Sequence, residues 1–315
     1  MVAAASHRQK AGPMIAMLLE EYGDEINITE PVLMRAAKNP WKGGTAAFAL
    51  LLNKGGDKVK ITEKMVSEIA LEGPVETMAL LLNERGDEFK ITKDVIISAT
   101  LNKKEMLGLL LQQRLNEVEI TEAIIKASIK THYPETLKLL LDNVDEKVIT
   151  ARLVVAAADA CFQGPAKISL LLNKGGHEIK ITEDILKAAM GNRFSGLEIT
   201  TLLLDKYGHE VEMTEDVVKA AVQNDKQGSD IVSLLLDRCG HEITITEDIV
   251  KEALRNWYCG PDIMSLLLDE RGHEICITDD IMRIAQDRGY KKDEMLMLLQ
   301  GWKSGENVTR NQLSV

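Results

Sequence analysis

The stretch GHEIKITEDIL, Gly176 to Leu186, combines a His-Glu pair, a Thr-Glu-Asp cluster and alternating isoleucines. Taken alone, these residue types suggest a metal site or an acid–base site. The stretch recurs, however, because an aligned threonine returns at spacings of 33, 30, 29 and 29 residues and then four times at 32. The aligned threonines are Thr29, Thr62, Thr92, Thr121, Thr150, Thr182, Thr214, Thr246 and Thr278, and a weaker tenth copy begins at Thr309. Such a recurrence indicates a repeat protein.

Each repeat predicts two short helices joined by a turn. The threonine is a natural N-cap for the first helix, and the acidic residues after it suit the positive end of the helix dipole. Apolar residues follow at helical spacing, as in Ile249, Val250 and Ala253. A leucine-rich second helix then ends at a glycine, which we expect to form a left-handed C-terminal cap. This glycine is present in seven copies: Gly23, Gly56, Gly86, Gly176, Gly208, Gly240 and Gly272. The link after it, as in HEIKI, alternates polar and apolar residues and is expected to be extended.

A single helix pair cannot bury its apolar face, but stacked pairs can. We therefore expect an all-α fold, an α-solenoid of about nine to ten repeats of ~32 residues with short extended connectors. It is expected to form one domain over residues 1–315, with a half-repeat at 11–23 whose first helix is missing and a partial repeat at 305–315. Leu115 and Asp145 replace the capping glycine, so we expect altered curvature or a small kink near residues 112–150.

Paired short helices with an extended connector resemble ankyrin repeats, although the T-P-L-H signature is missing. Over residues 13–309 the chain is more similar to the degenerate, ankyrin-like helical repeat arrays of fungal proteins, including the sensor regions of NOD-like receptors. The resemblance implies a stacked recognition scaffold and assigns no individual residue a role.

Composition narrows the function classes. A net charge of −11 and a pI near 5.2 disfavour nucleic acid as a partner. No apolar run is long enough for a membrane span, and the first residues lack the apolar core of a signal peptide. The four cysteines show no CxxC spacing and are expected to be reduced thiols in a cytoplasmic protein.

The histidines and acids of the repeat are best explained as structural. His177, His209, His241 and His273 lie 32 residues apart. Equivalent positions in stacked helices are about 8–10 Å apart, too far for ligands of one metal ion. The acids after each threonine recur as Glu-to-Lys pairs at four-residue spacing, which stabilise a helix surface. We expect no metal and no cofactor, and no motif marks a catalytic residue.

The few aromatic residues are more informative about function. Six lie twelve residues after the threonine of their repeat, in the turn between the two helices, and a seventh lies beside one of them. They are Trp41, Tyr133, Phe162, Phe194, Tyr258 and Tyr290, with Trp257 as the neighbour. Each ring could cover a helix end and pack on the next repeat. Alternatively, the rings form a row of anchors for a partner.

The position five residues after the threonine differs in character between early and late repeats. The last repeats carry Lys187, Lys219, Lys251 and Arg283 there, whereas earlier repeats carry Met34, Ile97 and Val155. If this position faces solvent, the apolar residues form a patch for a partner. If it is packed, they belong to the core.

The sequence thus predicts a recognition scaffold without catalysis, which binds a protein or peptide along a repeated helical surface. Whether the chain is an enzyme stays open. The alternative is an unusual cyclase or isomerase of fungal secondary metabolism with a pocket in a concave face, using residues that break the repeat pattern: Asp159, His132, Gln163 and Asn192. A third interpretation is a structural or assembly spacer, and the chain could also belong to a longer array or a larger multidomain protein.

Overall fold

The computed structural model describes residues 1–23, 25–208 and 210–304, and these residues are helical with no strand. The chain divides into two compact units, Met1–Val148 (unit 1) and Ile149–Val315 (unit 2). None of the described helices combines the length and the apolar character that a membrane crossing requires. The partial repeat expected at 305–315 and the side chains of His177 and His209 lie outside the described part.

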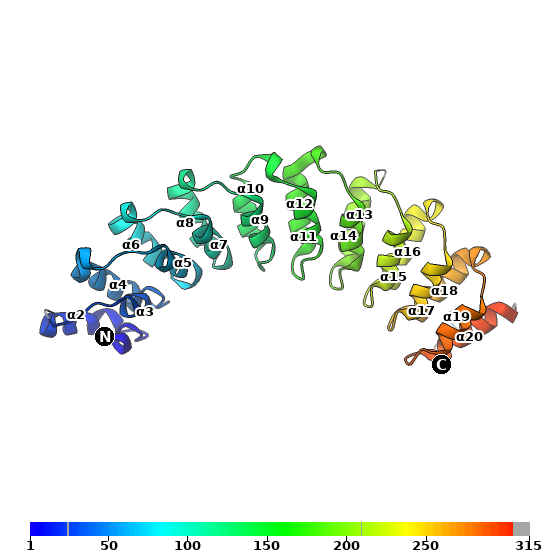
Figure 1. Cartoon of the computed structure of the whole chain (residues 1–315), viewed down its shortest axis with the longest axis horizontal. Helices are drawn as coiled ribbons and strands as arrows, with labels where there is room; N and C mark the ends of the chain where they lie inside the picture. Colours follow the sequence, from blue (N-terminus) through cyan, green and yellow to red (C-terminus); the bar gives the residue numbers. More distant parts are fainter. Residues whose placement is uncertain (24, 209, 305–315) are drawn as a thin grey trace. The chain divides into compact units, whose positions relative to one another are not determined.

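Unit 1 consists of helix pairs with short 3-10 turns after most second helices (Figure 1). Its elements are α1 Val2–Ala5, α2 Ala11–Tyr22, α3 Glu30–Ala37, α4 Lys42–Gly55, η1 Gly56–Lys58, α5 Glu63–Glu72, α6 Val75–Arg85, η2 Gly86–Glu88, α7 Lys93–Leu101, α8 Lys104–Arg114, η3 Leu115–Glu117, α9 Glu122–Ile129, α10 Pro134–Leu141 and η4 Glu146–Val148.

Unit 2 continues the same alternation of first and second helices. Its elements are α11 Ala151–Ala158, α12 Gly164–Gly175, η5 Gly176–Glu178, α13 Glu183–Gly191, α14 Gly196–Tyr207, α15 Glu215–Gln223, α16 Gly228–Cys239, η6 Gly240–Glu242, α17 Glu247–Arg255, α18 Gly260–Arg271, η7 Gly272–Glu274, α19 Asp279–Gln286 and α20 Lys292–Ser304.

Within each unit, first helices pack on first helices and second helices on second helices. In unit 2 the series α11, α13, α15, α17, α19 forms one layer and α12, α14, α16, α18, α20 the other. Unit 1 has the same two layers, from α1 to α9 and from α2 to α10. This two-layer stacking confirms the predicted α-solenoid.

The core lies between the layers and is built from the repeated apolar positions. Ile249, Val250 and Ala253 of α17 are each no more than 1% exposed, and the leucines on the inner face of the second helices are also buried. The predicted threonine N-caps are confirmed by position in every first helix from α3 to α19. In five of them the hydroxyl accepts the backbone N–H three residues on, for example from Ile249 to Thr246 at 3.3 Å.

The left-handed helical cap predicted at the repeated glycine is not formed. Of the seven repeated glycines, Gly56 and Gly176 alone have positive φ, at +47° and +57°, but their ψ of −140° and −144° lies outside the left-handed helical region. Both follow another glycine. At Gly240 and Gly272 φ is −54° and −58°, and the backbone stays right-handed as it enters a 3-10 turn. Gly272 is needed there for a different reason, because a Cβ would lie 2.2 Å from the indole ring of Trp302.

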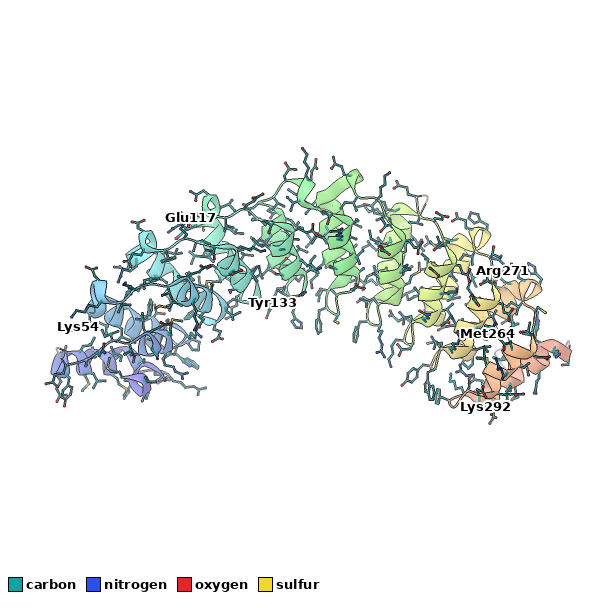
Figure 2. The ribbon with its side chains drawn as sticks, viewed as in Figure 1. Lys54, Glu117, Tyr133, Met264, Arg271 and Lys292 are labelled. Carbon is teal, nitrogen blue, oxygen red and sulfur yellow. The ribbon has the colours of Figure 1, made fainter. Side chains whose placement is uncertain are left out.

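The link between repeats also differs from the expectation. Its first residues, such as Gly240–Glu242, form one turn of 3-10 helix, and only the residues after it are extended. An Arg–Glu pair of the next repeat binds this link. The guanidinium of Arg271 donates to Gly240 O at 2.6 Å and to Ile243 O at 2.8 Å, while Glu274 accepts the N–H of Ile245 at 2.9 Å. Figure 2 shows Arg271 on the link side of unit 2 and Lys292 on the opposite side.

At the opposite end of each pair, asparagines join neighbouring repeats. Asn224 donates from its side-chain amide to Met190 O at 2.8 Å and to Asn192 O at 2.9 Å. Its side-chain oxygen accepts the N–H groups of Lys226 and Gln227, so it also shapes its own turn. The residues that donate in this way, each ten positions after its threonine, are Asn39, Asn102, Asn192, Asn224 and Asn256.

The first helix of the N-terminal pair is shortened rather than missing. The four residues of α1, Val2–Ala5, pack against α2 and α3. Asn39 donates to Ala5 O at 2.9 Å, the contact that asparagines of later repeats make with the preceding first helix. The expected half-repeat at 11–23 is therefore the second helix of a pair whose first helix is α1.

Candidate binding surface

The turns between first and second helices form one side of each unit, which we call the loop side. In unit 2 it comprises residues 159–163, 192–195, 224–227, 256–259 and 287–291 (Figure 1). All seven aromatic residues singled out in the sequence lie on the loop sides, and every ring is exposed, from 45% for Tyr290 to 68% for Phe194. All seven rings are therefore at least partly open to solvent.

Three of the rings form a cluster at the last two turns of unit 2. Trp257 and Tyr290 are stacked, with ring centroids 6.0 Å apart and planes inclined by 9°. Tyr258 lies 6.1 Å from Tyr290 at an angle of 58°. Two hydrogen bonds fix the main chain that carries two of these rings: Asn256 accepts the N–H of Tyr258 at 3.2 Å, and Arg288 donates to Trp257 O at 3.3 Å. We call Trp257, Tyr258 and Tyr290 the ring cluster.

Ring faces on the loop sides already contact cations of the chain itself. The ammonium of Lys226 lies 4.8 Å from the ring centroid of Tyr258 in unit 2. In unit 1 the guanidinium of Arg8 lies 5.1 Å from the ring centroid of Trp41. Such distances are within the range of cation–π attraction. Figure 2 shows Tyr133 extending from the loop side of unit 1, opposite Glu117.

A groove runs from the ring cluster across the first helices of unit 2. It has a volume of about 580 Å³ and is open to solvent. Trp257 is one of its lining residues, and the walls carry two ion pairs, Arg193–Asp225 at 2.7 Å and Arg255–Glu252 at 2.6 Å. We call it the first-helix groove. Its other lining residues are Lys187, Gly191, Ala220, Gln223, Asn224 and Asn256.

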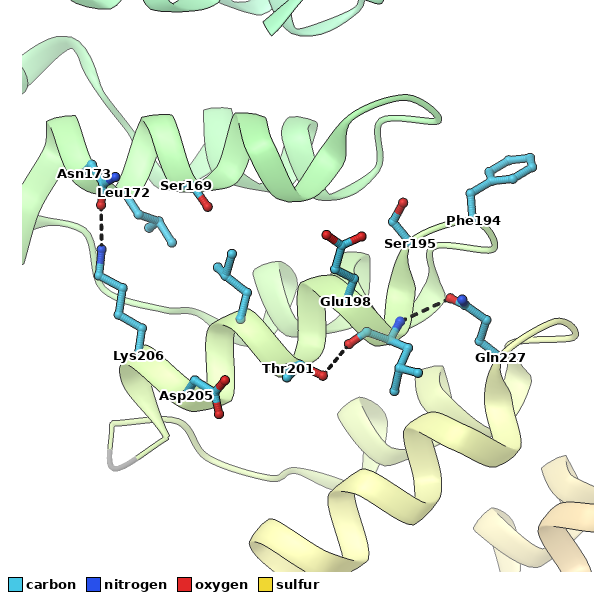
Figure 3. Close-up of a pocket in the computed structure, with 12 residues that line it drawn as sticks. Ser169, Leu172, Asn173, Phe194, Ser195, Glu198, Thr201, Asp205, Lys206 and Gln227 are labelled. Atoms are coloured by element: carbon cyan, nitrogen blue, oxygen red, sulfur yellow. Dashed lines mark hydrogen bonds between the residues drawn. The ribbon is translucent and has the colours of Figure 1, made fainter.

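A second groove lies between the second helices α12 and α14 (Figure 3). Its volume is about 650 Å³, with Leu172 in its floor and Phe194 at the end toward the loop side. Two hydrogen bonds join polar groups of the lining: Lys206 donates to Asn173 at 2.9 Å, and Gln227 accepts the N–H of Leu197 at 3.1 Å.

The residues five positions after the threonine divide between core and surface. Met34 is only 7% exposed and belongs to the core, whereas Ile97 and Val155 are half-buried. These three therefore do not form an open apolar patch. In the later repeats Lys219 and Lys251 pair with Glu215 and Glu247, as predicted, and also reach Asp248 and Asp280 of the next repeat. This position therefore holds repeats together.

Two of the repeated histidines, His241 and His273, have exposed side chains. The side chains of His241 and His273 are 78% and 75% exposed, and each lies near the glutamate that follows it. Within the described residues no group of three or more His, Cys, Asp or Glu side chains is placed to hold a metal ion.

The four residues proposed to break the repeat pattern all lie in turns between first and second helices. Asn192 follows the pattern, as one of the joining asparagines, and is 7% exposed. Gln163 is exposed in a turn with φ of +55°, and Asp159 is also exposed. Neither these residues nor His132 lines the two grooves described above.

Two kinds of residue that shape the turns of the loop side were not among the sequence predictions. The joining asparagines could have been found, because they recur ten residues after the threonine. Lys167 is a true departure from the pattern, since it is fully buried where Ile199 and Ile231 stand in the next repeats. Its ammonium donates to Phe162 O at 2.8 Å and so fixes the turn that carries Phe162, while burial lowers the pKa of Lys167.

Comparison with known proteins identifies a family for this chain but assigns it no activity. A family model described as a domain of unknown function, DUF7104, matches repeatedly and covers more than half of the chain, and no curated protein matches. Each match begins in or near a second helix and ends in the next pair. The matched residues are 17–45, 50–68, 80–105, 109–128, 170–199, 202–231, 234–264 and 266–285. The unmatched residues 129–169 include the division between the two units. The chain thus belongs to the DUF7104 family, with its family repeats running through both units.

Proposed function

We propose that the chain is a non-catalytic recognition scaffold, and that unit 2 binds a protein or peptide through its loop side and first-helix groove. The observation that carries the proposal is the exposure of the ring cluster. Trp257, Tyr258 and Tyr290 are 53%, 48% and 45% exposed in a chain of only twelve aromatic residues. Exposed aromatic anchors of this kind dominate binding energy at protein interfaces.

The surroundings of the rings suit an extended partner. The first-helix groove is open and continuous with Trp257, so a peptide that contacts the rings can extend along α15 and α17. Its ion pairs are partly exposed and form a polar rim. A central group of rings with a polar rim is the usual organisation of a binding surface.

The scaffold supports this use because it is rigid where the rings are attached. The turn of Trp257 and Tyr258 is fixed by four hydrogen bonds of Asn256, two donated to the preceding repeat and two accepted within the turn. A partner that binds preorganised rings loses less conformational freedom than one that must order them.

The setting we propose is the cytoplasm, and the class is that of ankyrin-like arrays such as the sensor regions of fungal NOD-like receptors. All four cysteines are free thiols, as is usual in a reducing compartment. The similarity in repeat organisation supports a role in recognition and names no partner.

A peptide selection tests the proposal. A random peptide library is selected on the immobilised full chain, and the recovered peptides are then offered to wild type and to the double variant Trp257→Ala plus Tyr258→Ala. We expect the double variant to lose most of the capture, whereas Met297→Ala, which removes an exposed side chain from the second helix α20, leaves it unchanged. Equal capture by the double variant would overturn the proposal.

A further inference from the structure

We infer that the partner segment is proline-rich and uncharged, and that it lies in the polyproline II conformation across the ring cluster of unit 2. This inference rests on the proposed function and specifies the chemistry of the partner. Three observations carry it: the arrangement of the rings, the compensation of charge beside them, and the polar lining of the adjacent groove.

The ring cluster presents closely spaced aromatic faces in two orientations. Trp257 and Tyr290 are nearly parallel, with centroids 6.0 Å apart, and Tyr258 lies 6.1 Å from Tyr290 with its plane inclined by 58°. A polyproline II segment rises about 3.1 Å per residue, so prolines two residues apart along it are separated by about the same distance as neighbouring rings. Exposed aromatic surfaces of this kind bind proline-rich segments.

The charges beside the rings are compensated within the chain, which favours an uncharged partner. In the first-helix groove Arg193 pairs with Asp225 at 2.7 Å and Arg255 pairs with Glu252 at 2.6 Å. Lys187, which also lines the groove, pairs with acids of its own helix. A charged segment would have to separate such a pair or lie beside a like charge, whereas an uncharged segment meets neither cost.

Other common modes of peptide recognition fit this surface less well. An amphipathic helix needs an apolar groove, but the first-helix groove is lined mainly by charged and amide side chains. A partner strand needs the edge of a sheet, and the residues that the structure describes are helical with no strand. A phosphorylated segment needs arginines to bind it, and Arg193 and Arg255 are held by carboxylates. Recognition of a polyproline II segment needs only exposed aromatic faces.

The hydrogen-bonding groups of the two sides are also complementary. Each ring of the cluster carries a donor at its edge, the indole N–H of Trp257 or the hydroxyl of Tyr258 or Tyr290. The ammonium of Lys226, 4.8 Å from the ring centroid of Tyr258, is a further donor. A proline-rich main chain offers carbonyl acceptors and few N–H donors. Because it is also stiff before it binds, it loses little conformational freedom on rings that Asn256 already holds in place.

The test uses a fluorescein-labelled peptide of twelve prolines and measures its binding to the full chain by fluorescence anisotropy. Peptides of six Gly-Ser, six Gly-Arg and six Gly-Glu repeats, labelled in the same way, are the flexible, basic and acidic probes of equal length. The key variant is Trp257→Ala plus Tyr290→Ala, because it removes both stacked rings and leaves the net charge unchanged. Met297→Ala is the control, and circular dichroism verifies that each variant keeps its helix content.

The proline peptide is expected to bind wild type and Met297→Ala alike, and to bind the double variant about tenfold more weakly. Glu252→Gln plus Arg255→Gln, which removes an ion pair of the groove without changing the net charge, is expected to bind it as wild type does. The inference is overturned if the ring variant binds the proline peptide as well as wild type does. It is also overturned if the proline peptide does not bind, or if any of the other three peptides binds more tightly.

The two proposals can fail separately. If library-selected peptides need Trp257 and Tyr258 but the proline peptide does not bind, the partner class is wrong and the binding surface stands. If no peptide depends on these rings, both proposals are wrong.

Discussion

The side-chain amide of Asn256 donates to the main-chain carbonyl of Asn224, the equivalent residue one repeat earlier, at 3.0 Å. Asn224 in turn donates to the carbonyl of Asn192 at 2.9 Å. Each asparagine therefore contributes both ends of a repeated contact, its amide to the preceding turn and its carbonyl to the following one. This chain of contacts runs directly beneath the turns that carry the ring cluster, so the stacking of repeats and the placement of the proposed binding surface have the same structural cause.

Removal of one joining asparagine is expected to destabilise the fold. In Asn224→Ala the carbonyls of Met190 and Asn192 lose buried hydrogen bonds. The N–H groups of Lys226 and Gln227 lose part-buried ones. We expect the free energy of unfolding to fall by about 2–3 kcal/mol. Urea denaturation followed by circular dichroism measures it. Asn173→Ala is the control, because Asn173 is exposed and its change should stay within about 0.5 kcal/mol.

The repeated glycine is expected to tolerate alanine at one repeat and not at another. Gly176→Ala forces a side chain into φ of +57° and should lower the free energy of unfolding by about 1–3 kcal/mol, although no atom lies within 4 Å of the new Cβ. Gly240→Ala has a right-handed backbone and its nearest neighbour at 3.9 Å, so its stability should be unchanged or slightly higher. Thermal unfolding of the two variants compares them directly. Equal losses at both positions would contradict this account of the glycines.

The Arg271–Glu274 pair that binds the link predicts a loss of stability in acid. The N–H of Ile245, together with Arg271, holds the pKa of Glu274 below its usual range, against the opposing effect of burial. Because the folded pKa is lower than the unfolded one, the stabilisation is fully present above the unfolded pKa and is lost as the pH falls through the folded pKa. Denaturation of wild type and Glu274→Gln between pH 7 and pH 3 should therefore converge in acid. A gap that stays constant over this range would show that the charge of Glu274 does not matter.

The thiols are expected to react in two classes. Cys161 and Cys276 are exposed, whereas Cys239 and Cys259 are buried, and burial raises the pKa of Cys239. Titration of the native chain with a chromogenic disulfide should therefore give two fast and two slow thiols. The variant Cys161→Ser plus Cys276→Ser should lose the fast phase. A fast phase that survives in this variant would place Cys239 or Cys259 at the surface.

Much of the fold follows from periodicity that a single sequence displays. Threonine, the paired acids and the apolar spacing specify the start and inner face of each first helix, and the Lys219–Glu215 pair follows from helix geometry. The conformation of the glycines could not be read in this way. Gly176 and Gly240 occupy the same place in their repeats, yet the first follows a second glycine and the second follows Cys239, and only the first adopts a positive φ.

The candidate site was predicted less completely. The exposed rings can be predicted because six of them recur twelve residues after the threonine in a chain with few aromatic residues, but their grouping depends on distances between turns. Trp257 and Tyr290 come together only when α17 and α19 stack. The buried Lys167 and the asparagine contacts likewise involve main-chain carbonyls, which a sequence pattern does not mark.

The central claim is that unit 2 uses its loop side, and not its links or second helices, to bind a partner. Carbene footprinting of the full chain with and without a library-selected peptide tests this most directly, because it reports which side chains the peptide covers. We predict protection in residues 256–259 and 287–291, with unchanged labelling in the links around Gly240–Glu242 and Gly272–Glu274. Protection confined to the links or to the second helices, with Trp257, Tyr258 and Tyr290 labelled as in the free chain, would contradict the claim.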